Sequence, residues 1–244
     1  MSPTITMATA RRVLTQLRHD RRTMAMLLLL PAVLMVLLRY VFDSKPVFNH
    51  VAPSLLGLFP FTVMFLVTSV ATLRERTSGT LERLMTTPMN KVDLLLGYGI
   101  AFGVVAVVQV AVVAAITVTW LGLDIAGSIW ILLLVAVVDA LYGTASGLFV
   151  SAFARSEFQA VQFLPVVVMP QVLLCGLFTA RGHMARLLEW VSDVMPLSYA
   201  VDAMNRVTAS STVGGKVWRD VAILGGVAVF ALIAGAATLR RRTP

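Results

Sequence analysis

One acidic side chain lies inside an apolar stretch and is the first candidate for chemistry. Asp139 is near the middle of the apolar run 128–153. A charge at the centre of a bilayer costs about 3 kcal/mol on insertion scales, so the carboxyl needs a partner, a cavity or a proton. Asp139 is therefore either a contact for a transported molecule, a member of a gating pair, or a carboxyl satisfied by buried neighbours. The sequence is compatible with all of these interpretations.

Three amides lie in other apolar runs, at Gln109, Gln162 and Gln171. An amide in a membrane helix either lines a polar pathway or forms hydrogen bonds between helices. We treat the three glutamines and Asp139 as candidates for a translocation path, with helix packing as the alternative. Pairs of glycines one turn apart, at 99 and 103 and at 143 and 147, predict close helix packing.

The residue types required for catalysis are missing or unsuitably spaced. No Gly-x-x-x-x-Gly-Lys-Ser/Thr run occurs, which excludes a P-loop nucleotide site. Ser146 lies in a GTASG run, but no later apolar run carries a histidine to act as its base. The single cysteine, Cys175, forms no internal disulfide and no thiol zinc site. We expect no catalytic residue, metal or cofactor in this chain.

The composition is that of a membrane protein. Of 244 residues, 58% are hydrophobic and 13% are charged, against about 25% charged in soluble domains. Six apolar runs are long enough to cross a bilayer as helices, which satisfy their own backbone hydrogen bonds in lipid. These runs are 23–42, 53–73, 94–120, 128–153, 158–179 and 221–239.

The sequence thus predicts an all-α, polytopic membrane protein with six transmembrane helices in a single transmembrane domain, 1–244. Residues 1–22 place Val13 and Leu17 among arginines, which predicts an N-terminal interfacial amphipathic helix; a disordered basic leader is the alternative. The segment 180–218 carries apolar side chains that predict two short external helices, broken near Pro196.

Basic residues set the expected orientation in the membrane. The net charge is +8, and most of the 20 Lys and Arg residues flank one set of run ends, in 1–22, 74–93, 154–157 and the C-terminal tail. Such residues favour the cytoplasmic side. We expect a multi-pass protein of the inner (plasma) membrane with both termini cytoplasmic. Topology explains the positive charge, so no nucleic acid partner is expected.

The loop 74–92 is polar and has a helical pattern. Leu81 and Leu84 share one face of a short helix, Gly79 precedes it and Pro88 ends it. Its charges have both signs, which favours a protein partner over a lipid surface. A docking helix and a solvated connector are both compatible with this pattern.

Two motifs resemble segments of one transporter family. Residues 74–97, RERTSGTLERLMTTPMNKVDLLLG, resemble the segment between the second and third spans of type-2 ABC exporter permeases. Residues 195–207, MPLSYAVDAMNRV, resemble the segment before the last span of daunorubicin-resistance-type permeases. In the second motif Met195 and Asn205 replace the usual Asn and Arg.

The resemblance implies that the first loop carries a coupling helix that docks on a separate ATPase subunit. The corresponding coupling residues are Glu75, Gly79, Thr80, Leu81, Glu82, Arg83 and Leu84, and the external gate candidates are Pro196, Tyr199 and Asp202. The resemblance also implies two ABC ATPase subunits that bind ATP and Mg, and a second permease copy or homologue. The cargo would be a drug-like or lipid amphipathic molecule exported from the cell.

Two other functions are compatible with the residues alone. A proton-coupled secondary transporter would use Asp139 and need no ATPase. A non-transporting membrane scaffold would tolerate loss of Asp139 and show no nucleotide-linked change. A neighbouring reading frame with Walker motifs would favour the exporter.

Overall fold

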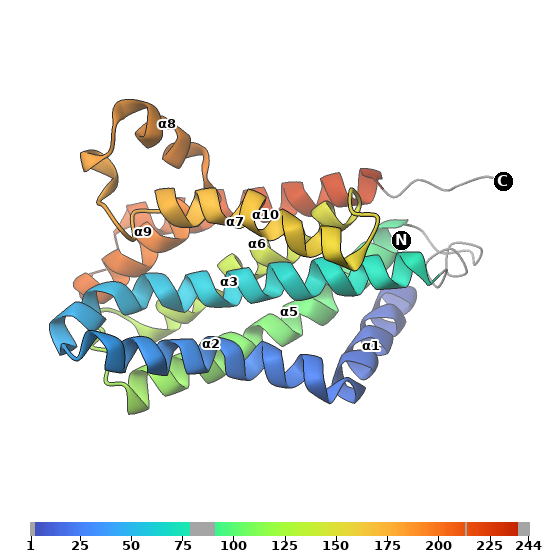
Figure 1. Ribbon diagram of the computed structural model, residues 1–244, viewed down its shortest axis with the longest axis horizontal. Helices are drawn as coiled ribbons and strands as arrows, with labels where there is room; N and C mark the ends of the chain where they lie inside the picture. Colours follow the sequence, from blue (N-terminus) through green and yellow to red (C-terminus); the bar gives the residue numbers. More distant parts are fainter. Residues whose placement is uncertain (1–2, 79–90, 213, 239–244) are drawn as a thin grey trace.

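A computed structural model describes residues 3–78, 91–212 and 214–238 of the chain. Every regular element within these ranges is helical (Figure 1). The elements are α1 (Pro3–His19), α2 (Arg21–Phe42), α3 (Lys45–Thr77), α5 (Lys91–Ala115), its π-helical continuation η1 (Ile116–Trp120), α6 (Ile129–Ser151), α7 (Glu157–Leu174), the 3₁₀ turn η2 (Arg181–His183), α8 (Arg186–Val194), α9 (Pro196–Ala209) and α10 (Gly215–Thr238).

Six helices are long and apolar enough to cross a membrane, which confirms the predicted all-α fold and span count. They are α2, α3, α5 with η1, α6, α7 and α10. The start of α1 and the described end of α10 lie toward the same end of the molecule, whereas α8 lies at the opposite end (Figure 1). An even number of spans requires this placement of the two chain ends.

Some helix ends differ from the ranges expected from the apolar runs. α3 begins at Lys45 rather than at residue 53, because Pro46 fits the first turn of a helix. α10 begins at Gly215 rather than at residue 221, so the predicted external segment is shorter than 180–218. α7 ends at Leu174 rather than at residue 179, because Gly176 turns the chain with a φ of 95°.

α3 and α6 form the centre of the bundle, and glycine brings their backbones together. A Cβ added to Gly143 would lie 2.4 Å from the carbonyl oxygen of Phe61, and one on Gly147 would lie 2.5 Å from that of Phe65. The packing role predicted for this glycine pair is confirmed. For Gly99 it is wrong, since no described atom lies within 4 Å of a Cβ placed there.

α1 is a helix, as predicted, and one of its faces is fixed to the bundle. Its buried side chains include Thr9, Val13 and Leu17, which face α5 and the neighbouring core. Arg12 donates hydrogen bonds to Glu75 of α3 and to Tyr98 of α5, both at 3.1 Å. The opposite, basic face of α1 stays exposed.

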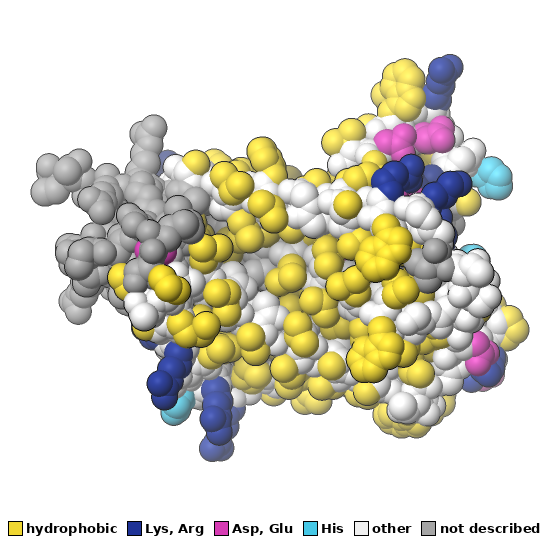
Figure 2. Space-filling model, turned by 180° about the vertical axis from the view of Figure 1, so that it is seen from behind, with side chains coloured by type: hydrophobic (Ala, Val, Ile, Leu, Met, Phe, Trp, Pro, Cys, Tyr) yellow, Lys and Arg dark blue, Asp and Glu magenta, His cyan; other side chains and the backbone are white. Residues whose placement is uncertain are grey.

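The outer surface suits a lipid environment. Figure 2 shows apolar side chains over most of one face, with charged side chains gathered toward the two ends of the molecule. α2, α7 and α10 are the least enclosed spans, with 22%, 17% and 22% of their most apolar stretch buried, against 67% for α3. These three helices therefore provide most of the surface available to lipid or to a second subunit.

Candidate functional site

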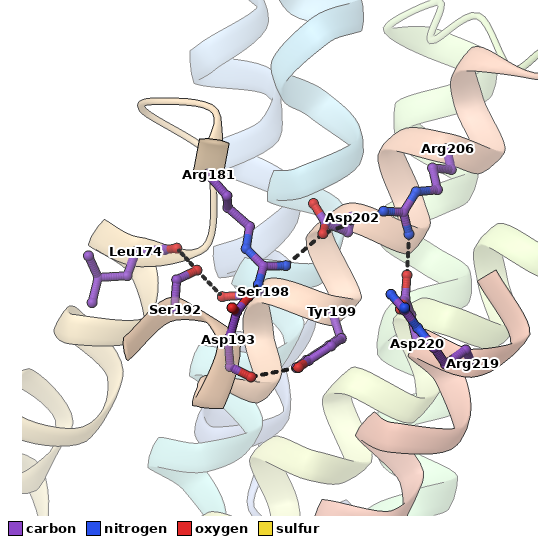
Figure 3. A network of polar contacts seen from close by, with 10 residues as sticks. All are labelled: Leu174, Arg181, Ser192, Asp193, Ser198, Tyr199, Asp202, Arg206, Arg219 and Asp220. Carbon is purple, nitrogen blue, oxygen red and sulfur yellow. Dashed lines mark hydrogen bonds and ion pairs between the residues drawn. The ribbon is translucent and has the colours of Figure 1, made fainter. Parts of the chain in front are cut away.

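A network of ionic contacts joins four segments (Figure 3), at the end of the molecule that lies away from α1 in Figure 1. Its charged members are three arginines and three aspartates from η2, α8, α9 and α10: Arg181, Asp193, Asp202, Arg206, Arg219 and Asp220. All of them except Asp220 line a hollow of about 380 Å³ together with Glu189, Tyr199 and Ile223.

Arg181 holds α8 and α9 together. One guanidinium nitrogen of Arg181 donates to Asp202 of α9 at 2.7 Å, and the other pairs with Asp193 of α8. The guanidinium also lies 5.6 Å from the ring centre of Tyr199, whose hydroxyl donates to the Asp193 carbonyl at 2.6 Å. Most of the Arg181 side chain is enclosed by these contacts, which fix α8 against α9.

A second part of the network ties α9 to α10. Arg206 pairs with Asp220 and lies 3.7 Å from the Asp202 carboxylate. Arg219 donates to the other oxygen of Asp220 at 2.9 Å. The Asp220 side chain is only 1% exposed, so its charge depends on these two arginines. The alternating charges therefore form one connected link from α8 through α9 to α10.

The predicted external gate residues differ in their surroundings. Tyr199 and Asp202 belong to the ionic network, whereas Pro196 is buried at the first turn of α9. Sequence reasoning missed Arg181, Arg206 and Asp220 as members. The sequence did contain one indication of Asp220, which is an acidic residue beside the basic Arg219 at the edge of an apolar run.

Asp139 lies fully buried in α6, between α3 and α9. A Cβ added to Gly57 of α3 would lie 3.0 Å from the Asp139 carboxyl and 2.7 Å from the Met204 methyl of α9. Among the described residues neither carboxyl oxygen has a hydrogen-bond partner. The described part of the chain thus offers the Asp139 carboxyl no hydrogen-bond donor.

The three glutamines occupy different environments. Gln109 of α5 donates to the Leu27 carbonyl of α2 at 2.8 Å. Gln171 of α7 accepts from the Tyr142 hydroxyl of α6 at 3.2 Å. Both therefore link helices, which favours packing over a pathway. Gln162 is exposed on α7, so it faces lipid or another subunit.

Of the predicted coupling residues, only Glu75 is among the described ones. It accepts from Arg12 at 3.1 Å, and its side chain is 16% exposed, so it connects α3 to α1. The other coupling residues lie outside the described part of the chain: Gly79, Thr80, Leu81, Glu82, Arg83 and Leu84.

Comparison with known proteins identifies the family. The family model described as ABC-2 type transporter matches residues 4–207. The chain belongs to the ABC-2 type transporter family. This ABC-2 permease is 26% identical over 171 residues to the Probable multidrug ABC transporter permease YbhR of Escherichia coli (strain K12), covering 70% of this chain and 46% of that protein.

Two further relatives extend the comparison. The ABC-2 permease is 25% identical over 159 residues to ABC transporter G family member 20 of Dictyostelium discoideum, covering 65% of this chain and 22% of that protein. It is 28% identical over 136 residues to Inner membrane transport permease YhhJ of Escherichia coli (strain K12), covering 55% and 36%. The matched part of the chain spans less than half the length of these relatives.

Family membership confirms the resemblance drawn from the two sequence motifs. The chain is a permease-type membrane protein of the ABC-2 class, and its six long apolar helices agree with a multi-pass location.

Proposed function

We propose that this ABC-2 permease is the membrane subunit of an ATP-driven exporter. In this proposal it moves an amphipathic drug-like or lipid cargo out of the cell, with two separate ATPase subunits binding ATP and Mg. Support comes from the family match and from relatives named as multidrug permeases. In the proposed orientation both termini lie in the cytoplasm, because most of the basic residues flank the ends of the spans on that side of the membrane.

The observation that carries this proposal is the path of α3. The helix runs without a break for 33 residues, a length of about 50 Å at 1.5 Å per residue. Its Thr77 end leads into the segment that resembles a coupling helix. Near its other end Ser54 donates to Asn205 of α9 at 3.2 Å. A displacement at the ATPase end would thus reach α9 through one continuous helix, which carries Pro53 and Pro60 in its interior.

We propose that the ionic network of η2, α8, α9 and α10 acts as an external gate, because α3 connects it to the ATPase end. α9 carries Asp202 and Arg206, so movement of α9 would pull on the pairs with Arg181 and Asp220. Opening at this end then requires exchange of ionic partners. Asp139 lies where α3 meets α9, and we propose that its carboxyl gains a partner from the cargo or from the rearranged helices.

The proposed assembly contains a second permease copy or a homologue. α7 has the least buried stretch of the six spans and carries Gln162 on its exposed side. An amide facing lipid leaves its hydrogen bonds unmade, whereas one facing another subunit can form them. We therefore place the second permease against α7.

Co-purification tests the coupling part of the proposal. We expect Glu82→Arg to reduce recovery of the ATPase with the permease while membrane insertion stays normal, because the charge reversal disturbs the docking surface. Glu189→Arg is the matched control, since α8 lies at the opposite end of the molecule. Equal ATPase recovery from both variants would contradict docking at this loop.

A proton-coupled carrier is the second candidate, because Asp139 is buried without a partner among the described residues. The two functions differ in their energy source. An inactive ATPase partner abolishes cargo movement in the exporter, whereas the carrier keeps its transport and loses it when the proton gradient is collapsed.

A further inference from the structure

The short helix α8 turns its apolar side chains away from the rest of the protein. Leu187, Trp190 and Val194 lie on one face of this helix, at positions i, i+3 and i+7, and they are 70%, 60% and 79% exposed. A surface helix of a soluble protein has the opposite arrangement, with its apolar face against the core. The exposed face of α8 therefore calls for an apolar environment that no described residue supplies.

Polar contacts fix α8 to the bundle in this orientation. The Ser192 hydroxyl is buried and donates to the carbonyl of Leu174, the last residue of α7, at 2.7 Å. The Asp193 carboxylate pairs with Arg181, and the Asp193 carbonyl accepts from the Tyr199 hydroxyl at 2.6 Å. Because these contacts come from the face opposite the apolar one, a rotation of α8 that buried its apolar face would break them.

The position of α8 along the bundle is that of a membrane interface. Figures 1 and 2 show α8 to one side of the bundle, near the end opposite α1 and not beyond that end. The chain has three other tryptophans, and all are exposed at this end: Trp120 closes η1, Trp130 is in the first turn of α6 and Trp218 is in the first turn of α10. Tryptophan is enriched where hydrocarbon meets headgroups, so we expect this end of the bundle to lie at that boundary.

The size of the exposed face favours lipid over a second subunit. A stable protein interface buries about 800 Å² on each partner, whereas one large aromatic side chain buries about 150–250 Å². Trp190 with Leu187 and Val194 beside it supplies well under the area that a stable dimer needs. The Cζ atom of Arg186 lies 5.5 Å from the ring centre of Trp190, so the guanidinium can reach lipid headgroups while the ring enters the hydrocarbon.

We propose that α8 is an interfacial helix whose partner is the lipid bilayer. Leu187, Trp190 and Val194 insert among the acyl chains of the leaflet at this end of the bundle, which is the outer leaflet in the orientation proposed above. The polar face of the same helix carries Asp193, a member of the ionic network. α8 therefore connects the lipid interface to the network that joins α8, α9 and α10.

Fluorescence quenching of Trp190 in the full-length protein tests this placement. Replacing the three other tryptophans by phenylalanine leaves Trp190 as the only native reporter. The protein is reconstituted into phosphatidylcholine vesicles whose acyl chains carry bromine near the headgroup or near the terminal methyl, and acrylamide quenches from the water. We expect the shallow bromines to quench Trp190 at least about twofold more than the deep ones, with little quenching by acrylamide.

Reporters in a background without native tryptophan give the reference values. Val229→Trp, near the middle of α10 and at a residue that is 56% exposed, should be quenched more by the deep bromines. Glu189→Trp lies on the opposite face of α8, in the charged hollow, and should be quenched mainly by acrylamide. Val194→Trp repeats the Trp190 measurement from a second position on the apolar face.

Three results would overturn the proposal. Acrylamide quenching of Trp190 as strong as that of the Glu189→Trp reporter would place the apolar face in water. Protection of Trp190 from both acrylamide and bromine would mean that protein covers the face, as in a contact with a second copy. Stronger quenching by the deep bromines would place α8 inside the hydrocarbon core and not at its boundary. The measurement needs no ATPase and no cargo, so its outcome is independent of the exporter proposal.

Discussion

Asp139 is the residue whose surroundings depart most from those of an ordinary buried side chain. It is completely enclosed, and neither oxygen finds a donor among the described residues. An unsatisfied buried polar group costs about 1–3 kcal/mol, so the carboxyl weakens the packing between α3 and α9 in this state. A buried carboxyl without a donor is a candidate for a functional role.

This expectation leads to a prediction for Asp139→Asn. The amide is the same size, so we expect the melting temperature in detergent to be unchanged while transport per folded molecule falls at least about tenfold. Gln109→Leu is the contrasting variant. It loses the bond to Leu27 and should lower stability by about 1 kcal/mol without changing transport per molecule. Parallel loss of transport and folded protein in the Asp139 variant would make it a structural residue.

Asp220 is a buried carboxylate that, unlike Asp139, has ion-pair partners, so removing a partner should lower the stability of the protein. Arg206→Gln removes the guanidinium that joins α9 to α10 and leaves a carboxylate that is 1% exposed with Arg219 alone. We expect a loss of about 1–2 kcal/mol, less than for a fully buried pair since Arg206 is 38% exposed. Thermal unfolding in detergent measures it. Arg219→Gln, on a more exposed side chain, should cost less; an equal cost would show that the α9–α10 contact adds nothing.

At the scale of elements, the contact between α3 and α6 depends on the absence of a side chain. Gly143→Ala would place a methyl group 2.4 Å from the Phe61 carbonyl oxygen, so the two helices must separate. We expect a cost of about 1–3 kcal/mol, measured as a lower melting temperature. Gly99→Ala is the matched control, because its methyl meets no described atom and should stabilise α5 slightly. A neutral Gly143 variant would mean that the helices can repack.

The helical elements could be predicted from the sequence because length and hydropathy decide them locally. The start of α3 could not, since Pro46 reads equally well as a loop residue until the helix is seen to begin there. The ionic network was also beyond sequence reasoning. Arg181 pairs with Asp202 across η2 and α9, and Arg206 pairs with Asp220 across α9 and α10, so both pairs depend on how these segments pack. The burial of Asp139 was predictable, but its position between α3 and α9 was not.

At the scale of the whole molecule, the exposed faces of the spans indicate whether lipid or another subunit lies against them. α7 presents Phe158, Val166 and Met169 to the outside, with Gln162 among them. α10 presents Phe230 and Ile233, with no amide on that face. An entirely apolar face is satisfied by lipid, whereas the amide on α7 favours a partner that can accept and donate hydrogen bonds.

Cysteine cross-linking distinguishes these two faces in native membranes. We expect Gln162→Cys to give an oxidised permease dimer, because a second permease packed on α7 brings the thiols within disulfide reach. The native Cys175 is 0% exposed and should stay unreactive, so the wild-type chain is the blank. Ile233→Cys on α10 is the control, at a residue that is 63% exposed. Cross-linking at α10 instead of α7 would place the partner on the other side of the bundle, and the polar side chain of Gln162 would then have to be explained by lipid contact alone.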